Sequence, residues 1–144
     1  MSAVHGHINY ALATALNTAL GSTITVSGTT YQYYNSVPVD APNTYVRMGE
    51  IIDRDNGTKE AFIYEGTVPI IVNDESSNVA DRKLAYSIMA KVRSILKGSK
   101  TAVLSLSGYT MTVFAFDTSL ETISYNDEGR VQIQLIDIYR FIIE

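Results

Sequence analysis

The sequence predicts an α+β domain, in which an antiparallel β-sheet carries two α-helices packed mainly on one face. Two segments repeat apolar residues at helical spacing, and most of the remainder alternates apolar and polar residues at the period of a strand. The elements follow the order helix, strands, helix, strands, and no single strands alternate with helices. This order is typical of an antiparallel sheet with its helices on one side. At 144 residues, the chain fits one domain spanning residues 1–144.

The two predicted helices span His5–Leu20 and Asn78–Gly98. Each has one apolar stripe at spacings of three and four residues, which predicts that one side of the helix is buried. Gly21 and Gly98 stand where a glycine commonly ends a helix. Asn78 is a residue type that begins helices well, because its side chain can accept a hydrogen bond from a free backbone N–H.

Between the helices, the period changes to that of strands. Ser22–Tyr34 is rich in Thr, Val and Tyr, and Gly28 divides it into two short predicted strands. The following segment contains Pro38 and Pro42 and cannot be helical, because each proline fixes its own φ and restrains the residue before it. We therefore expect a stiff, extended segment between the second and third strands.

A longer hairpin is predicted next. Thr44–Asp53 alternates, which places three apolar residues on one face: Val46, Met48 and Ile52. Asn56-Gly57 is a strong signal for a tight hairpin turn, and a returning strand is predicted over Lys59–Asn73. Pro69 lies on the opposite phase from the apolar residues of that strand, which favours a sheet edge or a bulge there. Further strands are predicted at residues 102–106, 110–116 and 131–144.

The composition narrows the possible functions. The net charge is −4 and charged residues make up only 18% of the chain, so strong binding to nucleic-acid phosphates is not expected. Interfaces between subunits are depleted in charge and enriched in tyrosine, and this chain has 10 tyrosines. There is no cysteine, which excludes disulfides and thiolate metal sites. Neither a signal peptide nor a membrane span is expected.

Several short motifs imitate functional sites. The segment from Asp53 to Gly57 is similar to the start of a calcium loop, but its glycine is fifth rather than sixth and the required twelfth-position glutamate is a tyrosine. Gly98–Thr101 is similar to the end of a phosphate-binding loop, but it follows a helix and precedes a strand, the reverse of what that loop requires. Turns explain both segments.

No catalytic or metal-binding constellation emerges from the sequence. His5 and His7 are the only histidines, and no nearby acidic residue offers a third metal ligand. Acidic pairs such as Asp74-Glu75 lie beside turn residues, and carboxylates from distant segments remain a possible acid–base pair. We expect no enzyme activity, no metal and no cofactor. Six of the 11 cations fall between Arg82 and Lys100, either as a patch for an acidic partner or as the polar side of the second helix.

One segment carries a resemblance to a known family. Val37-Pro38-Val39-Asp40-Ala41-Pro42-Asn43-Thr44-Tyr45-Val46, followed by Gly49-Glu50, resembles a V-P-x-x-A-P-x-x-Y-V pattern in the tail-completion or tail-terminator proteins of tailed bacteriophages. The order of elements along most of the chain is also similar to that family. This sequence departs from the pattern at Asn43-Thr44, where the family often has a more apolar residue.

The resemblance implies a structural role in a virion. Such proteins form rings, usually hexameric, which cap the tail tube and join it to the head-completion proteins of the neck. The partners would be further copies of the chain, the head-completion protein and the tail tube protein, and DNA would pass through the ring without specific binding. The site would be the head–tail junction of a virion assembled in the host cytoplasm, with no contact to a membrane.

The stiff segment is the predicted subunit interface. Six residues are expected to contribute to it: Tyr33, Tyr34, Val37, Pro38, Pro42 and Tyr45. A ring built from head-to-tail contacts uses two different surfaces of each subunit, and a proline-stiffened arm loses little entropy on docking. Three alternatives remain open: the segment is an ordinary loop whose tyrosines pack on the domain's own core, the chain is another neck component such as a head-completion protein or a short-tail ring, or the chain is a monomeric α+β domain that binds a ligand or catalyses a reaction.

Overall fold

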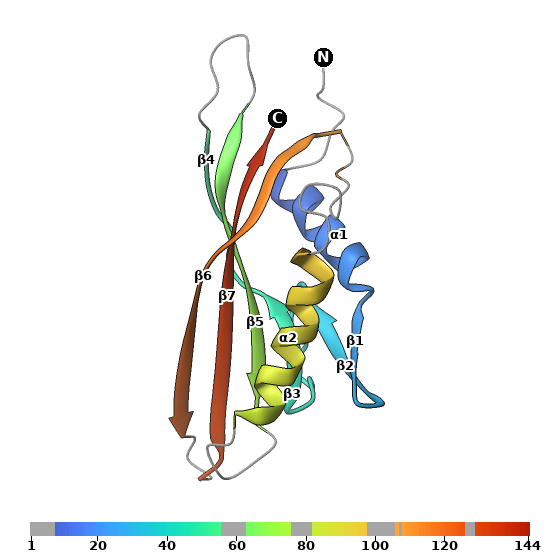
Figure 1. Ribbon diagram of the computed structural model, residues 1–144, viewed down its shortest axis with the longest axis vertical. Helices are drawn as coiled ribbons and strands as arrows, with labels where there is room; N and C mark the ends of the chain where they lie inside the picture. The colour runs from blue at the N-terminus through green and yellow to red at the C-terminus, as the bar shows by residue number, and fades with distance from the viewer. Residues whose placement is uncertain (1–7, 56–62, 76–81, 98–105, 107, 126–128) are drawn as a thin grey trace.

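The computed structural model describes residues 8–55, 63–75, 82–97, 106, 108–125 and 129–144. Figure 1 shows an elongated, twisted sheet with both helices on the same side, which confirms the predicted α+β class. The described elements are α1 (Ile8–Leu20), β1 (Thr23–Val26), β2 (Thr29–Tyr34), β3 (Thr44–Met48), β4 (Ile52–Asp55), β5 (Tyr64–Asp74), α2 (Lys83–Lys97), β6 (Met111–Tyr125) and β7 (Val131–Ile143).

The sheet is mixed, with the order β1-β2-β3-β5-β7-β6 and with β4 beside β5. The described pairings are antiparallel except that of β2 with β3, which is parallel. The expectation of an antiparallel sheet therefore holds apart from this pair. The pair can be parallel because residues 35–43 lead the chain from the end of β2 back to the start of β3. The turn predicted at Asn56-Gly57 lies outside the described residues, but the strands on either side of it pair as a hairpin requires.

The two faces of the sheet differ along β7, which pairs with every residue of β5. The odd-numbered residues of β7, from Val131 to Ile143, are buried beneath the helices, and we call their side the helix face. The even-numbered residues lie on the other side, the open face, where burial is partial or absent. Because directly paired residues of antiparallel strands share a face, the register assigns the residues of β5 and β6 to the two faces as well.

The helices bury the apolar stripes that their sequences predict. From α1 the core receives Ile8, Leu12, Ala15, Leu16 and Leu20, and from α2 it receives Ala85, Ile88, Met89, Val92 and Leu96. Gly21 ends α1 with a φ of 71°, a conformation that glycine adopts without steric cost. The predicted first residue of the second helix, Asn78, and its predicted last residue, Gly98, lie outside the described residues.

The predicted strand Thr44–Asp53 is interrupted, and the predicted position of Ile52 is wrong. Val46 and Met48 belong to the helix face, as expected. Between Met48 and Ile52 the chain leaves the regular ladder, so the alternation changes phase. Ile51 therefore packs against the core, whereas Ile52 lies on the open face with 71% of its surface exposed.

Pro69 explains where the interruption falls. β5 is a central strand rather than an edge, but Pro69 lies opposite the gap between β3 and β4. Its carbonyl accepts a hydrogen bond from the Gly49 N–H at 2.8 Å, and its missing N–H falls where no regular strand requires one. A Cβ at Gly49 would lie 2.5 Å from the Pro69 Cγ, so a glycine allows this close approach.

β6 is much longer than the predicted strand at residues 110–116. It runs from Met111 to Tyr125, and its register against β7 shifts between Phe116 and Thr118. This bulge changes the phase of alternation, and most residues beyond it are exposed, so no apolar pattern marks the continuation. Of the strand predicted at residues 102–106, only Leu106 is described, and it is buried.

Candidate subunit interface

The predicted interface residues occupy three different environments. Tyr33 has only 3% of its surface exposed and belongs to the core of its own subunit, where burial raises the pKa of its hydroxyl well above the usual value. Tyr34 and Tyr45 contact each other edge to face, with ring centroids 5.8 Å apart. The other three residues are exposed: Val37, Pro38 and Pro42. A subunit contact made by these residues stays a prediction.

The segment between β2 and β3, residues 35–43, forms a short arm that is fixed at both ends. The Asn35 amide donates to the Ala13 carbonyl of α1 at 3.1 Å, and the Asn43 carbonyl accepts from the Glu75 N–H at 3.0 Å. In the middle, the Ala41 N–H donates to the Pro38 carbonyl at 3.2 Å and closes a turn. These bonds leave an exposed apolar surface on a stiff segment.

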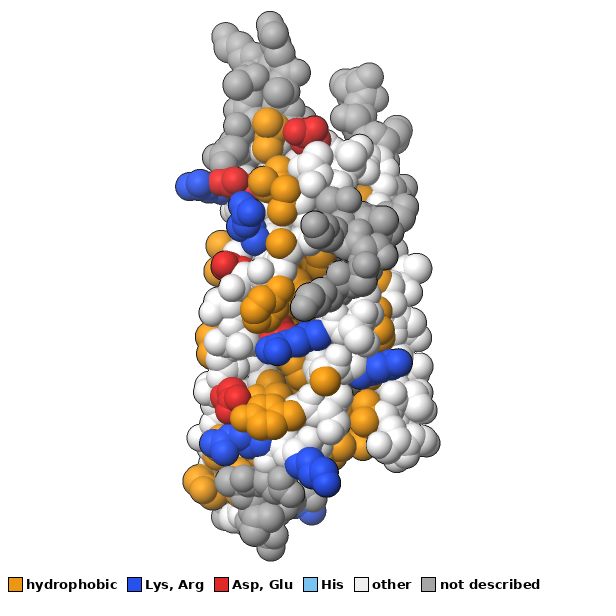
Figure 2. Space-filling model, viewed as in Figure 1, with side chains coloured by type: hydrophobic (Ala, Val, Ile, Leu, Met, Phe, Trp, Pro, Cys, Tyr) orange, Lys and Arg blue, Asp and Glu red, His pale blue; other side chains and the backbone are white. Residues whose placement is uncertain are grey.

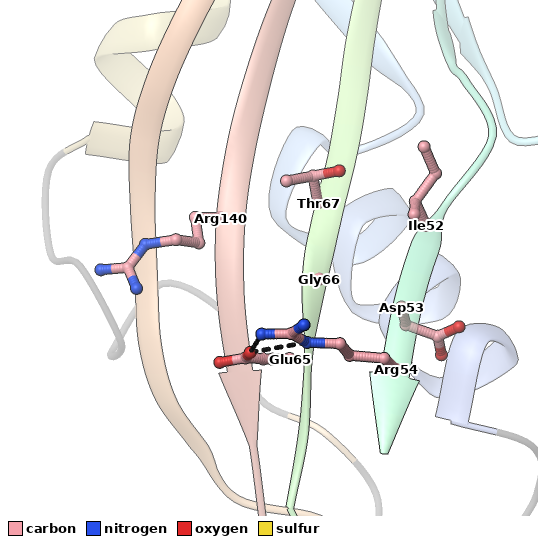
Figure 3. A pocket seen from close by; sticks show the side chains of 7 residues that line it. All are labelled: Ile52, Asp53, Arg54, Glu65, Gly66, Thr67 and Arg140. Carbon is pink, nitrogen blue, oxygen red and sulfur yellow. Dashed lines mark hydrogen bonds and ion pairs between the residues drawn. The ribbon is translucent and has the colours of Figure 1, made fainter. Parts of the chain in front are cut away.

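A shallow pocket of about 330 Å³ is lined by residues of β4, β5 and β7 (Figure 3). Its lining residues are Ile52, Asp53, Arg54, Glu65, Gly66, Thr67 and Arg140. Arg54 Nε donates to the Glu65 carboxylate at 2.9 Å, and the Arg140 side chain points away from that ion pair in Figure 3. A Cβ at Gly66 would lie 2.0 Å from the Ile52 carbonyl oxygen, so glycine lets β4 lie close against β5.

Two arginines, Arg82 just before α2 and Arg93 within it, are paired within the subunit. Arg82 lies 3.2 Å from Glu121 of β6, and the same carboxylate accepts the Tyr86 hydroxyl at 2.7 Å. Arg93 donates two hydrogen bonds to Asp137 of β7, and these bonds raise the pKa of the guanidinium. Figure 2 shows basic, acidic and apolar side chains interspersed over this side of the molecule. Part of the predicted basic cluster is therefore neutralised by its own subunit.

Side-chain amides form a hydrogen-bond network on the open face. Asn73 Oδ1 accepts hydrogen bonds from the Gln132 amide at 2.7 Å and from the Gln134 amide at 3.4 Å. Ser124 of β6 donates to the Gln132 side-chain oxygen at 3.2 Å. These contacts satisfy polar side chains on a face that no helix covers.

The sheet edges also carry exposed apolar side chains, and their exposure was not predicted from the sequence. In β6 they are Phe116, Leu120 and Tyr125, and Ile52 of β4 is the counterpart on another edge. The signal that could have revealed β6 is its composition. Between Met111 and Tyr125 the chain has three threonines, two phenylalanines and one residue each of Val, Ile and Tyr, all types that favour strands, and it has no lysine and no proline.

Other predicted motifs can be placed only in part. His5, His7 and Gly98–Thr101 lie outside the described residues, and the segment from Asp53 to Gly57 is described only as far as the end of β4. Within the described ranges, no group of three or more His, Cys, Asp or Glu side chains could hold a metal ion. Neither α1 nor α2 combines the length and the apolar character needed to cross a membrane.

Comparison with known proteins reveals a similarity of fold. No family model matches the chain, and no curated protein matches it. Among solved structures, it is similar to a chain from the virion of a native gene transfer agent particle, with a TM-score of 0.66 and 22% sequence identity. The match covers 94% of this chain and 97% of that chain. At this identity, the likeness establishes a shared fold over nearly the whole of both chains.

Proposed function

We propose that this chain is a structural protein of a phage-like virion. The observation that carries the proposal is the fold it shares, over nearly its full length, with a chain of a gene transfer agent virion. The residues Val37–Val46 add a second argument, because their pattern resembles that of tail-terminator proteins. A building subunit of this kind requires contact surfaces and no reaction centre.

More specifically, we propose that the chain is a tail-terminator or tail-completion subunit. Its ring, most simply a hexamer, would cap the tail tube and join it to the head-completion protein at the head–tail junction. DNA would pass through the ring without specific binding. The exposed, proline-stiffened residues Val37, Pro38 and Pro42 would contribute one side of a head-to-tail contact, with the Tyr34–Tyr45 pair supporting the arm from the open face.

The mass of the particle in solution tests this assignment. Light scattering over a range of concentration and salt, combined with negative-stain images, is expected to reveal rings of one defined stoichiometry. Replacing both Pro38 and Pro42 with alanine should weaken ring formation while the folded subunit remains, because a more flexible arm loses more entropy on docking. Alanine at two exposed threonines, Thr23 and Thr29, is the matched control and should leave the ring intact.

Two other assignments give different results in the same experiments. A different neck or short-tail ring component would also form rings, but it would bind a different neighbour in the tail, which purified tail tubes and head-completion protein can reveal. A monomeric ligand-binding or enzymatic domain is favoured by the 330 Å³ pocket, whose size is at the lower end for small-molecule sites. A monomer at every concentration, with a small molecule bound near Arg54, would contradict the ring assignment.

A further inference from the structure

At one end of the molecule, the sheet is reduced to four strands in the order β4-β5-β7-β6. Each neighbouring pair in this set is antiparallel. β4 and β6, the two outer strands, therefore run in opposite directions. We propose that the subunits of the ring join by strand pairing, with β4 of one copy adding to the free edge of β6 in the next copy. This inference rests on the ring proposed above and adds a second contact between neighbouring subunits, separate from the contact proposed for the arm.

The free edge of β6 can be identified from the hydrogen bonding. Thr110 and Glu144 exchange both of their backbone hydrogen bonds, each at 2.8 Å. In an antiparallel ladder such pairs alternate with pairs whose N–H and C=O groups point away from the partner strand. The even-numbered residues of β7 therefore bond to β6, and the residues of β6 opposite the odd-numbered ones direct their backbone groups outward. Ser119 and Glu121, opposite Asp137 and Leu135, belong to this outward set.

The same alternation identifies the free edge of β4. The odd-numbered residues of β7 bond to the even-numbered residues of β5, which leaves Glu65 and Thr67 of β5 to bond to β4. Their partners in β4 are Arg54 and Ile52. Asp53, between these two, accordingly directs its N–H and C=O away from the sheet. Both edges thus present backbone donors and acceptors to a further strand.

The side chains on these edges suit a covered surface. Of the eight large apolar side chains that are exposed in the described residues, one belongs to β4 and three to β6: Ile52, Phe116, Leu120 and Tyr125. Natural edge strands are commonly protected by lysine, proline or a short length, but β6 extends over 15 residues without either residue type. Its protection consists of two register shifts, at Met111/Val113 and at Phe116/Thr118, and of the charged residues Asp117 and Glu121. An edge of this length and composition is expected to pair with another strand.

A second copy of this chain is the occupant that the topology favours. If copies are related by rotation about an axis roughly along the strands, the same strand runs in the same direction in every copy. β6 then meets the neighbouring β4 in antiparallel orientation, which continues the alternation of β4, β5, β7 and β6. The contact uses two different edges, so it is head-to-tail, and a closed ring leaves neither edge free.

Cysteine cross-linking tests the pairing directly, because the natural chain has no cysteine. Ile52→Cys would be mixed with a chain carrying one cysteine on the open face of β6, at Val113, Ala115, Thr118 or Leu120 in turn, and then oxidised mildly. Ser119→Cys is the matched control, because Ser119 is on the same strand but on the helix face. Mixed dimers are expected at one or two of the four positions, with a yield about tenfold above the control, since disulfides tolerate only short Cβ separations.

A backbone variant provides an independent test. Asp53→Pro removes an N–H that the β4–β5 ladder does not use, and it should leave a folded subunit that no longer forms rings. Asp53→Ala changes the same side chain but keeps the N–H, and its rings should persist. Circular dichroism and thermal unfolding establish whether each variant is folded.

The outcomes separate this inference from the proposed function. Rings that form normally without cross-links to any open-face position, or that survive Asp53→Pro, would overturn the strand pairing and leave the ring assignment standing. Efficient self-linking of Leu120→Cys would indicate symmetric pairing of β6 with β6, which also overturns the inference. Neither rings nor cross-links, in solution or on purified tail tubes, would overturn both.

Discussion

The ion pair between Arg93 and Asp137 provides the sharpest stability prediction. Asp137 lies on the helix face of β7 with 1% of its surface exposed, on a face whose other buried residues in this strand are apolar or aromatic. Arg93 Nε lies 2.6 Å from Oδ2 and Arg93 Nη2 lies 2.8 Å from Oδ1, so both carboxylate oxygens are bonded. The guanidinium also lies over the ring of Phe116, 5.1 Å from its centroid.

Arg93→Met would leave a buried carboxylate without its partner. Breaking a buried ion pair by removing one member costs about 3–5 kcal/mol. The Arg93 side chain is 46% exposed, so water would reach part of the vacated space, and we expect a loss of about 2–4 kcal/mol in the free energy of unfolding. For a chain of this size, the loss corresponds to a fall in Tm of roughly 6–12 °C.

The double variant Arg93→Met/Asp137→Leu is the control that distinguishes the cost of an unpaired buried charge from the cost of lost packing. Replacing both members by apolar residues should keep the free energy of unfolding within about 1 kcal/mol of the natural chain. Urea unfolding followed by circular dichroism, with unchanged m-values, measures all variants on one scale. A single substitution that costs less than about 1 kcal/mol, or a double variant that costs as much as the sum of its two single substitutions, would refute the reasoning.

Further substitutions test the close contacts and the buried hydroxyls. Gly66→Ala should destabilise the domain by about 1–3 kcal/mol, because its Cβ would collide with the Ile52 carbonyl and push β4 from the sheet, which amide hydrogen exchange would detect. Burial raises the pKa of the Tyr33 and Tyr139 hydroxyls, so the folded state keeps these protons when the unfolded state has lost them, and stability should fall as the pH rises above about 10. Tyr139→Phe should reduce that alkaline loss and change stability at pH 7 by less than about 1 kcal/mol, because the hydroxyl has no hydrogen-bond partner within the described residues. Arg54→Gln should cost less than about 1 kcal/mol in the same unfolding assay, since its ion pair with Glu65 is largely exposed.

The sequence by itself determined the elements whose signals are local. The apolar stripe that ends at Gly21 predicted α1, and the alternation from Val131 onward predicted β7, because each pattern reports which side of one element is buried. The order of these elements was sufficient to predict the α+β class. The stiffness of the arm was equally readable, since Pro38 and Pro42 restrict the backbone in any fold.

Only the tertiary structure decided how these elements meet. The phase change that exposes Ile52 depends on the contact of Gly49 with Pro69, two residues that are distant in sequence. The continuation of β6 beyond Phe116 depends on pairing with β7, and burial of Tyr33 depends on the helices that cover its face. The free edges of β4 and β6 likewise follow from the strand order. A local pattern records which side of an element is apolar, whereas an edge, a bulge or a partner exists only in relation to a second strand, and this relation is set by long-range packing.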